Sequence, residues 1–467
     1  MNKNITARTK IIATTGPSSW DDSVLREMYR NGMSLARINA SFADFAELKR
    51  VSDQLRNISP RIAIILDTQG NKIRVKNLTE PIEIKERLIL SSENVGENIV
   101  NIGYPKLHEN IIVGSKILLD DGNIQLIVNS IEGSNIICNV IQGGILKPNK
   151  TVNIPDINLT FPVLTEKDRA DILFAIENNF DFVCASFVRN KEDVRMVREL
   201  LGDSNVGIIS KIENKEGVKN FTGILQASDG IMIARGDLGV EIDYDRVPIL
   251  QKQMIQKCRE AGKPVIVATQ MLESMRENIR PTRAEVSDVA NAVLDGADCL
   301  MLSAETSTGK YPAQSVATMY KSILTTESVM QPSKVKGTTD AGEDVDEIGN
   351  CIFNISQNIG LKSILLITDN AGTIGTVSRH RPNIPIYVVS SKLSSIRRNI
   401  IYNSVKTYHI QNLSPDRDQS IIDAVEQIYS YGELDLCDKI AIISGSSIKD
   451  KKGDSILEIL TVKDILK

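Results

Sequence analysis

The sequence of 467 residues has few histidines, no paired cysteines and no long apolar run. Its three histidines, His108, His380 and His409, are too few and too dispersed for a histidine-built metal centre. The six cysteines include no Cys-x-x-Cys pair, which argues against a zinc site and a disulfide framework and favours reduced, mostly buried thiols. Because no apolar run reaches membrane-spanning length and no signal peptide is recognisable, we expect a cytoplasmic protein without a membrane partner.

A strong net charge is missing as well. The formal net charge is −4 at pH 7, which gives no reason to expect nucleic acid or an anionic membrane as a partner. A hydrophobic content of 42% and a charged content of 24% are ordinary for a soluble protein. The length predicts about two to four domains.

Apolar runs that resemble buried strands alternate with helical patterns through most of the first 330 residues. This alternation predicts βα units and a parallel sheet. The expected strands are 9–15, 35–39, 62–68, 182–187, 207–213, 230–236, 264–270 and 299–305. Eight such units indicate an α/β fold of the (β/α)₈ TIM-barrel type, with the active site where the strands end.

Two further domains are expected. From about residue 72 to 155 the pattern changes to short β-type runs, with a hairpin turn at Asp120-Asp121-Gly122-Asn123, which predicts a small inserted β-barrel that acts as a lid. Polar residues then predict a linker, and strand-like runs at 363–368, 386–390 and 439–444 predict a C-terminal α/β regulatory domain. The expected boundaries are 1–70 and 156–330 for the barrel, 71–155 for the lid, 331–346 for the linker and 347–467 for the last domain.

Charged residues follow two neighbouring apolar runs. Lys211 and Glu213 are two positions apart, so their side chains share one face of an extended strand, and Arg235 and Asp237 repeat this spacing. Two carboxylates are suitable ligands for a divalent metal, and a lysine beside them suits a phosphoryl group in transit. The segment Gly236–Gly239 predicts a strand-to-helix turn that could bind a carboxylate through its N–H groups.

For any one of these residues, a salt bridge at the barrel rim is the simpler interpretation. A site is favoured because polar residues follow every expected strand. They are Thr14, Arg37, Asn39, Asp67, Ser186, Lys211, Glu213, Asp237, Thr269, Gln270, Ser303 and Glu305.

Several segments have residues in the order typical of one enzyme family. They are 9–17, 36–39, 164–168, 210–214, 234–239, 268–275, 281–286 and 301–306. Together they resemble pyruvate kinase over nearly the whole chain. The resemblance implies a cytoplasmic homotetramer that binds phosphoenolpyruvate and ADP and releases pyruvate and ATP, the last step of glycolysis.

The resemblance also implies roles for single residues. Lys211 would stabilise the phosphoryl group in transit, and Glu213 and Asp237 would hold Mg²⁺ or Mn²⁺. The remaining implied roles are phosphoryl contact for Arg37, carboxylate binding for Gly236, Asp237 and Thr269, a proton path for Thr269 and Ser303, and nucleotide binding for Arg74, Lys150, Thr14 and Pro17.

The chain departs from the family pattern in three places. Phe42 stands where the family often has a histidine, so a nucleotide contact expected there is in doubt, and Ala304 replaces a glycine. Lys72 stands where many members have the glutamate of a K⁺ site, whose other positions match Asn39, Ser41, Asp67 and Thr68. A tethered ammonium is one positive charge and would repel a second cation. We therefore expect that Lys72 replaces K⁺ and that K⁺ is not required.

A C-terminal segment indicates how the protein is regulated. Asp369-Asn370-Ala371-Gly372-Thr373 stands where members activated by fructose 1,6-bisphosphate have a Ser-Gly-Arg type cradle, so we expect no activation by that sugar bisphosphate. Another phosphorylated effector could use Thr368, Thr373 and the turn 444–447, although these are as consistent with ordinary strand-end turns.

Two other functions are compatible with the same fold. A catalytically silent metabolite sensor would have lost Lys211, Glu213 or Asp237, and all three are present. A lyase or aldolase acting on an enolpyruvate would not need the lid or the nucleotide-side residues Arg74 and Lys150.

Overall fold

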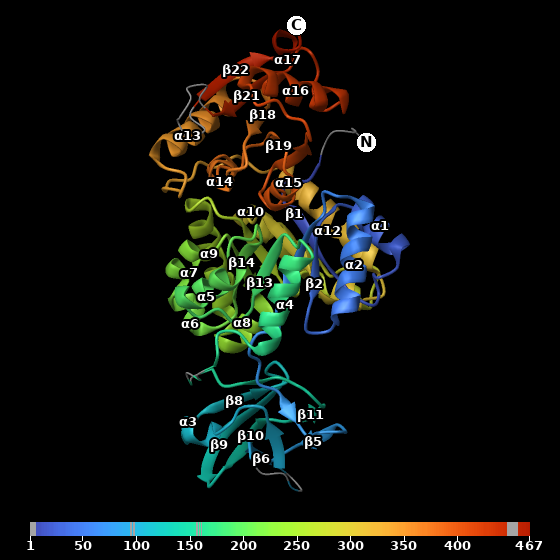
Figure 1. Ribbon diagram of the computed structural model, residues 1–467. Helices are drawn as coiled ribbons and strands as arrows, with labels where there is room; N and C mark the ends of the chain where they lie inside the picture. The colour runs from blue at the N-terminus through green and yellow to red at the C-terminus, as the bar shows by residue number, and fades with distance from the viewer. Residues whose placement is uncertain are drawn as a thin grey trace.

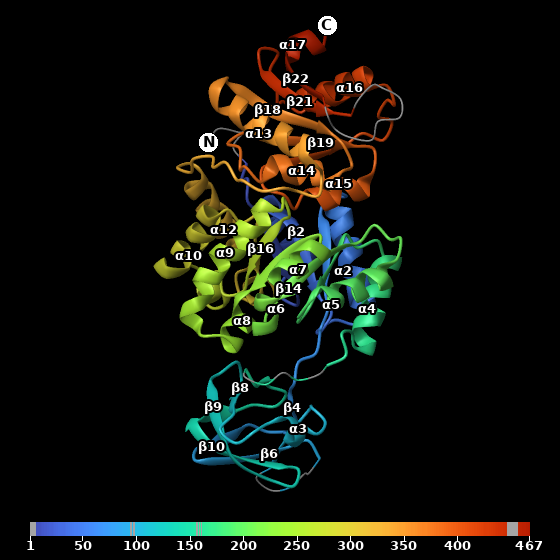
Figure 2. The same cartoon turned by 90° about the vertical axis from the view of Figure 1, so that its left-hand side faces the viewer.

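The computed structural model describes residues 6–93, 96, 99–155, 157, 159, 161–445 and 456–467. These residues form three bodies in a row (Figure 1). An eight-stranded barrel lies in the middle, with the lid at one end and the C-terminal domain at the other, and the view turned by 90° shows the same order (Figure 2). The two smaller domains therefore lie at opposite faces of the barrel.

The barrel is closed and all of its strands run parallel, as the sequence predicts. Its order is β1-β17-β16-β15-β14-β13-β3-β2. The strands are β1 (Lys10–Thr15), β2 (Met33–Asn39), β3 (Ala63–Asp67), β13 (Phe182–Ala185), β14 (Gly207–Ile212), β15 (Gly230–Ala234), β16 (Val265–Ala268) and β17 (Cys299–Leu302). Most of the expected strands were too long by one to three residues at their C-terminal ends, because the polar residues there lie in turns or begin helices.

Helices surround the barrel and bury their apolar faces against it. They are α1 (Asp22–Arg30), α2 (Phe45–Ile58), α4 (Glu166–Glu177), α5 (Lys191–Leu201), α6 (Lys215–Lys219), α7 (Phe221–Ala227), α8 (Arg235–Glu241), α9 (Val247–Glu260), α10 (Arg283–Asp295), α11 (Ala304–Ser307) and α12 (Pro312–Glu327), with 3₁₀ turns at Tyr244–Arg246 and Glu273–Arg276. Capping boxes begin α2, α4 and α10, where each cap side chain satisfies an N–H group that has no partner within the helix.

The lid is a barrel-like sheet inserted after β3. Its strands are β4 (Val75–Lys76), β5 (Ile82–Ile84), β6 (Arg87–Ser91), β7 (Ile99–Ile102), β8 (Lys116–Leu119), β9 (Ile124–Glu132), β10 (Asn135–Gln142), β11 (Gly144–Leu146) and β12 (Val152–Asn153). Seven of them follow the order β12-β8-β9-β10-β6-β7-β4, and β11 pairs with β5. The two ends of this sheet, β12 and β4, come together through two backbone hydrogen bonds. The Val152 N–H donates to the Ile73 carbonyl (2.9 Å), and the Val75 N–H donates to the Lys150 carbonyl (2.8 Å). One short helix, α3 (Leu107–Asn110), corrects the expectation of an all-β insertion.

The C-terminal domain is a five-stranded sheet with helices. Its elements are α13 (Glu343–Asn358), β18 (Leu361–Ile367), α14 (Ala371–Ser378), β19 (Ile386–Ser390), α15 (Leu393–Asn399), β20 (Val405–His409), α16 (Arg417–Ser430), β21 (Lys439–Ser444), β22 (Ile456–Thr461) and α17 (Val462–Ile465). The order is β20-β19-β18-β21-β22, and β22 is antiparallel. The sequence did not predict β20 or β22. Helix α13 begins at Glu343, so the end of the expected linker is helical.

Two general expectations can be compared with the structure. All six cysteines are free thiols, and four of them are buried, as expected. Within the part of the chain that the structure describes, no helix combines the length and apolar character needed to cross a membrane.

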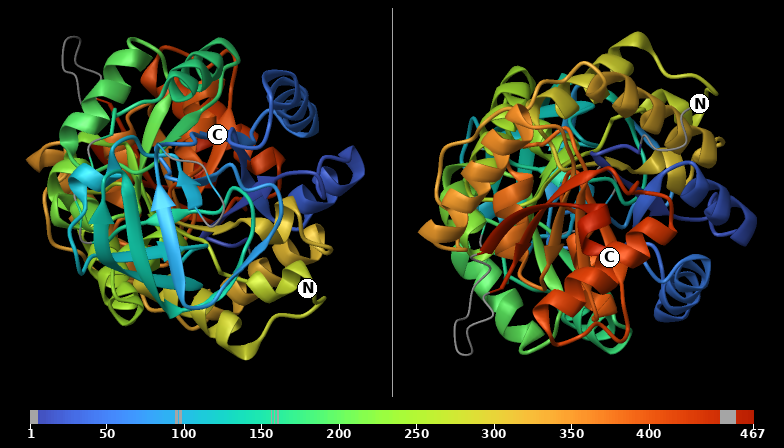
Figure 3. Two further views of the ribbon diagram at one scale, coloured as in Figure 1. Left: turned by 90° about the horizontal axis from the view of Figure 1, so that it is seen from below. Right: turned by 90° about the horizontal axis from the view of Figure 1, so that it is seen from above.

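Polar contacts attach the C-terminal domain to the N-terminal ends of the barrel strands. Asp298, just before β17, accepts hydrogen bonds from the Asn403 N–H (2.9 Å) and the Arg381 guanidinium (2.8 Å). Lys10, at the start of β1, donates to the Val405 carbonyl at 2.7 Å, and burial lowers the pKa of this lysine to about 8. Seen from either end, the lid and this domain cover opposite ends of the barrel (Figure 3). The C-terminal ends of the strands therefore face the lid.

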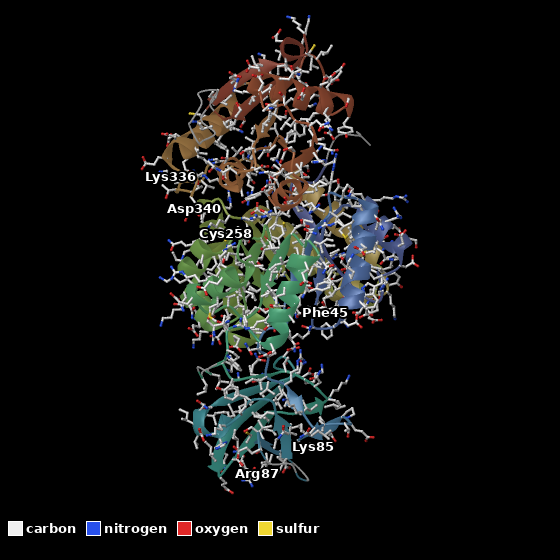
Figure 4. The ribbon with its side chains drawn as sticks, viewed as in Figure 1. Phe45, Lys85, Arg87, Cys258, Lys336 and Asp340 are labelled. Atoms are coloured by element: carbon white, nitrogen blue, oxygen red, sulfur yellow. The ribbon has the colours of Figure 1, made fainter. Side chains whose placement is uncertain are left out.

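The side-chain view agrees with this arrangement. Lys336 and Asp340, from the segment that leads into α13, lie at the junction of the barrel and the C-terminal domain (Figure 4). There the Asp340 carboxylate pairs with the Lys263 ammonium at 3.2 Å. Lys85 and Arg87 mark the lid, at the other end of the molecule.

We predict that Asp298→Ala destabilises the folded protein by about 3 to 5 kcal/mol, because it leaves the buried Arg381 charge without its counter-ion. Asp298 is 2% exposed and Arg381 is 6% exposed. The measurement is the urea midpoint followed by circular dichroism. Asp203→Ala, at an exposed position, is the control and should shift stability by less than about 0.5 kcal/mol. Equal midpoints for the two variants would contradict the prediction.

Candidate active site

The Lys211 ammonium lies at the centre of the polar residues that follow the barrel strands. Its Nζ atom is 3.0 Å from the Ser186 hydroxyl, 3.2 Å from a carboxylate oxygen of Asp67 and 3.0 Å from Oε1 of Glu213. Glu213 lies one residue beyond the end of β14 at Ile212, yet its carboxylate contacts Lys211, so the two side chains come together as their spacing predicts. Three neighbouring strands, β3, β13 and β14, therefore contribute to one cluster.

The charges in this cluster stabilise one another. Burial alone would lower the pKa of Lys211, but Asp67 and Glu213 outweigh burial and raise that pKa well above its ordinary value. Burial likewise opposes the charge of Asp67, yet Arg37 and Lys211 hold the pKa of that carboxyl below its usual range. Lysine and aspartate are thus both ionised in a nearly closed environment.

Arg37 is held beside the same carboxylate. Its Nε donates to Oδ2 of Asp67 at 2.6 Å, and its second terminal nitrogen contacts that oxygen as well. Its other terminal nitrogen donates to the Thr14 hydroxyl at 2.9 Å. The Thr14 hydroxyl in turn donates to the Leu302 carbonyl at 2.8 Å, which connects β2 with β1 and β17. Two cationic side chains, Lys211 and Arg37, therefore share Asp67.

Glu213 has an oxygen available for a metal. Its Oε2 atom accepts a hydrogen bond from the Phe187 N–H at 2.7 Å, whereas its buried Oε1 faces the Lys211 ammonium at 3.0 Å and has no further hydrogen-bond partner among the described residues. Burial raises the pKa of this carboxyl. The charge of Lys211 lowers that pKa, and the charge of Asp237 raises it. A hard cation would satisfy Oε1 and offset the repulsion between the two carboxylates, so these residues fit Mg²⁺ or Mn²⁺.

The number of carboxylates suits a metal that is shared with a substrate. Among the residues with described positions, no group of three or more histidine, cysteine, aspartate or glutamate side chains could hold a metal by itself. Mg²⁺ usually takes one or two carboxylates and completes its shell with water and substrate oxygens. A site built from Glu213 and Asp237 leaves ligand positions for both.

Arg235 and Asp237 do not share a strand face, although their spacing predicts it, and the Arg235 side chain is held outside the cluster. Strand β15 ends at Ala234 and α8 begins at Arg235, so the two residues do not share a strand face. The Arg235 guanidinium pairs with Asp288 (2.7 Å) and donates to the Thr269 carbonyl (2.8 Å). Its role in supporting the turn after β16 was missed by sequence reasoning.

That turn has an uncommon backbone conformation. Thr269 and Gln270 have φ values of 68° and 55°, in the left-handed region that non-glycine residues rarely occupy. The Thr269 hydroxyl accepts a hydrogen bond from the Gly236 N–H at 2.8 Å and donates to the Ala268 carbonyl at 2.6 Å. The structure thereby brings the first turn of α8 and the Thr269 hydroxyl together, as the expected carboxylate site requires.

Ser303 follows β17 and has a hydroxyl without a partner. Its N–H donates to Glu305 at 2.7 Å, while its buried Oγ forms no hydrogen bond to any described residue. Glu305 also accepts from the Leu272 N–H at 3.0 Å, and burial raises the pKa of its carboxyl. Glu305 thus fixes the backbone around Ser303.

The residues expected to bind nucleotide lie apart from this cluster, except for Thr14. Arg74 and Lys150 belong to the lid, where Arg74 donates to the Asn149 carbonyl (2.9 Å) and Lys150 pairs with Asp120 (2.5 Å). Pro17 and Phe42 are exposed after β1 and β2, and Phe42 is 78% exposed. The nucleotide residues therefore belong to two domains.

Lys72 interacts with Asp237 and Glu213, the two carboxylates expected to bind a metal. Its Nζ is 2.5 Å from Oδ1 of Asp237 and 5.3 Å from the centre of the Phe187 ring. At the four positions that match a K⁺ site, Asn39 accepts from the Ser41 N–H (3.0 Å), Thr68 donates to the Cys184 carbonyl (3.1 Å), and Asp67 binds Arg37. Phe187 contacts both Lys72 and Glu213, and the sequence analysis gave it no role. Its position after Ser186, at the end of an expected strand, could have indicated that it lies near the site.

A cavity of about 590 Å³ opens between the lid and the barrel. It is lined by hinge residues that include Asn71 and Lys72 and by barrel residues that include Ser186, Phe187 and Asn214. Its size is in the range of small-molecule sites. Buried cations, neighbouring carboxylates and a cavity under a lid define an enzyme of the (β/α)₈-barrel class that acts on a small anionic substrate.

Comparisons with known proteins identify the family. Residues 6–316 match the model of the pyruvate kinase barrel domain, and residues 346–460 match the model of the pyruvate kinase alpha/beta domain. The chain is 40% identical to pyruvate kinase from Geobacillus stearothermophilus over 98% of this chain and 81% of that protein. It is 36% identical to pyruvate kinase from Clostridium acetobutylicum over 98% of this chain and the full length of that protein. The chain belongs to the pyruvate kinase family.

We predict that Asp67→Asn flattens the loss of stability in acid. Because the pKa of Asp67 is lower in the folded state than in the unfolded chain, its contribution to stability is present above the unfolded value of about 3.9 and is lost as the pH falls through the folded value. The urea midpoint of the wild type should therefore fall more steeply than that of the variant between about pH 5 and pH 2. Parallel curves would show that Asp67 is not stabilised as a carboxylate.

Proposed function

We propose that this protein transfers the phosphoryl group of phosphoenolpyruvate to ADP and thereby forms pyruvate and ATP, the last step of glycolysis. The principal support is the buried Lys211 ammonium at the ends of the barrel strands, beside Arg37 and two carboxylates, in a chain of the pyruvate kinase family. No observation favours the silent sensor, because the residues that such a protein could lose are present and close together.

In this proposal two fixed cations neutralise the phosphoryl group as it moves between two oxygens. Lys211 stabilises the group in transit, and Arg37 contacts its oxygens from the side of β2. Both are oriented by Asp67 before substrate binds, so little reorganisation is needed during the reaction. Phosphoryl transfer depends on such positioning and charge neutralisation more than on covalent chemistry.

Glu213 and Asp237 hold the divalent cation, Mg²⁺ or Mn²⁺. When bound, the cation supplies positive charge that stabilises oxygen atoms on the phosphoryl group and the enolate. The buried Oε1 atom of Glu213, whose one close partner among the described residues is the Lys211 ammonium, supports this assignment. A cation bound by both carboxylates also offsets the repulsion between them.

The enolpyruvate part of the substrate lies against α8 and the turn after β16. The backbone of Gly236 and Asp237 and the Thr269 hydroxyl bind its carboxylate, supported by the short contact between Gly236 and Thr269. After the bond to phosphorus breaks, the electron pair stays on the enolate and its terminal carbon takes up a proton. Thr269 and Ser303 lie near the path of that proton, and the unpartnered Ser303 hydroxyl supports this placement.

ADP binds between the barrel and the lid. Arg74 and Lys150 contact its phosphates from the lid, and Thr14 and Pro17 contact it from the barrel. Phe42 cannot donate a hydrogen bond to the nucleotide, so any contact at that position is through its ring. Since the nucleotide residues come from two domains, ADP is bound fully only when the lid closes over it.

Four further properties belong to the same proposal. The barrel and lid keep the boundaries expected from the sequence, whereas the linker is shortened by helix α13, which begins at Glu343. The protein is a cytoplasmic homotetramer that fructose 1,6-bisphosphate does not activate. The Asp369 carboxylate accepts a hydrogen bond from the Ser390 hydroxyl and pairs with Lys392 (2.9 Å). It places a negative charge near the expected effector loop. Of the expected effector turn 444–447, Ser446 and Ser447 lie outside the described residues.

We predict that Lys211→Ala lowers turnover by about 10²-fold or more while the protein stays folded, since removal of a preorganised charge has effects of this size. Pyruvate formation from phosphoenolpyruvate, measured with and without ADP, also separates a kinase from a lyase and from a silent sensor. The control is Lys321→Ala, an exposed lysine on α12, which should retain wild-type turnover. Retention of most activity by Lys211→Ala would refute the role of this residue.

We also propose that K⁺ is not required, because the Lys72 ammonium is already a positive charge within the site. The wild type should be fully active with Mg²⁺ and ADP when tetramethylammonium is the only added monovalent cation. Lys72→Glu should create a requirement for K⁺. A many-fold rise in wild-type turnover when K⁺ replaces tetramethylammonium at constant ionic strength would rule out this role for Lys72.

A further inference from the structure

Both chain segments that connect the lid with the barrel contact one short helix. In the segment that leaves the barrel, Lys72 pairs with Asp237 at 2.5 Å. In the segment that returns, the Asn153 side chain donates to Glu241 at 2.8 Å. Asp237 and Glu241 are four residues apart on α8, so they lie on the same face of the helix. Helix α8 therefore holds the lid and, at Asp237, also provides a proposed metal ligand.

The Lys72 ammonium is placed to act on the metal-binding carboxylates. Its side chain and that of Asp237 are each only 23% exposed, and its Nζ packs 5.3 Å from the Phe187 ring centre. The Phe187 N–H binds Glu213, and the charge of Lys72 lowers the pKa of Glu213 against the larger effect of burial. Lys72 thus interacts with both carboxylates while it belongs to the hinge.

We propose that Lys72 is an internal counter-ion of the metal site, which a divalent cation displaces from Asp237 and which couples metal binding to release of the lid hinge. The inference rests on the proposed function, since it requires Glu213 and Asp237 to be the metal ligands. A divalent cation and an ammonium repel each other and need the same carboxylate oxygen. Once displaced, Lys72 no longer attaches its segment of the hinge to α8, whereas the contact between Asn153 and Glu241 remains.

The first test is the affinity for Mn²⁺ without substrate, measured by electron paramagnetic resonance of the free ion. Lys72→Met should bind Mn²⁺ about tenfold more tightly than the wild type, an effect typical of a close charge pair. Lys72→Arg, which keeps the positive charge, should bind as the wild type does. Unchanged affinity in Lys72→Met, or equal gains in both variants, would overturn the inference.

A matched control separates the charge of Lys72 from its attachment of the hinge. Asn153→Ala removes the other contact with α8 and leaves the counter-ion in place, so its Mn²⁺ affinity should equal that of the wild type. If Asn153→Ala binds Mn²⁺ as tightly as Lys72→Met, loosening of the lid and not the counter-ion explains the gain, and the inference is wrong.

The second test follows the hinge itself by hydrogen exchange of the backbone amides in residues 69–76. Mn²⁺ should speed exchange there in the wild type, whereas Lys72→Met should exchange rapidly with or without the metal. Exchange that does not respond to Mn²⁺ in the wild type would overturn the coupling. Melting curves establish that each variant is folded.

One further variant distinguishes failure of this inference from failure of the proposed metal site. Asp237→Asn should weaken Mn²⁺ binding whether or not Lys72 is a counter-ion. If Asp237→Asn binds Mn²⁺ as the wild type does, the proposed ligand set is wrong. If it binds weakly while Lys72→Met is unchanged, only the inference about Lys72 fails.

Discussion

The shared carboxylate of Asp67 is the interaction on which the site depends. It lies at the end of β3 and binds Arg37 from β2 and Lys211 from β14. Without it, two cations would lie together in a nearly closed environment, where Lys211 would lose its charge or either side chain would move towards solvent. The barrel makes this contact possible because parallel strands bring their C-terminal ends to one rim. The lid and the C-terminal domain are attached around this arrangement.

The two smaller domains contact the barrel in physically different ways. The C-terminal domain is held at the N-terminal face by buried groups, with Asp298 bound to Arg381 and Lys10 to the Val405 carbonyl. The lid is held at the opposite face by partly exposed side chains at its hinge. Buried, fully paired contacts are costly to break, whereas partly exposed ones exchange with water. The contacts that attach the C-terminal domain are therefore more costly to break than those at the hinge of the lid.

Much of the fold and of the central cluster could be predicted from the sequence, because the periodicity of apolar residues and the local composition are readable over short segments. The strand ends were less accurate: Glu213, Arg235 and Gln270 lie beyond their strands, since an apolar run gives no sign of where the backbone turns. Arg235 was misplaced for this reason. Strands β20 and β22 were missed, because β20 reads Val-Lys-Thr-Tyr-His and β22 has a charged residue within it. The partner of Lys72 was also beyond reach, since only the fold brings a hinge residue to α8.

Helix α8 shows why such a contact arises between residues distant in sequence. Asp237 lies in the first turn of α8, directly after β15, so it stands at the rim where the barrel strands end. A carboxylate in that position, with Glu213 nearby, attracts any cation that the chain can supply. The hinge of the lid passes over the same face, and a lysine there reaches Asp237 through its long and flexible side chain. The pairing of Lys72 with Asp237 therefore joins the hinge of the lid directly to the rim of the barrel.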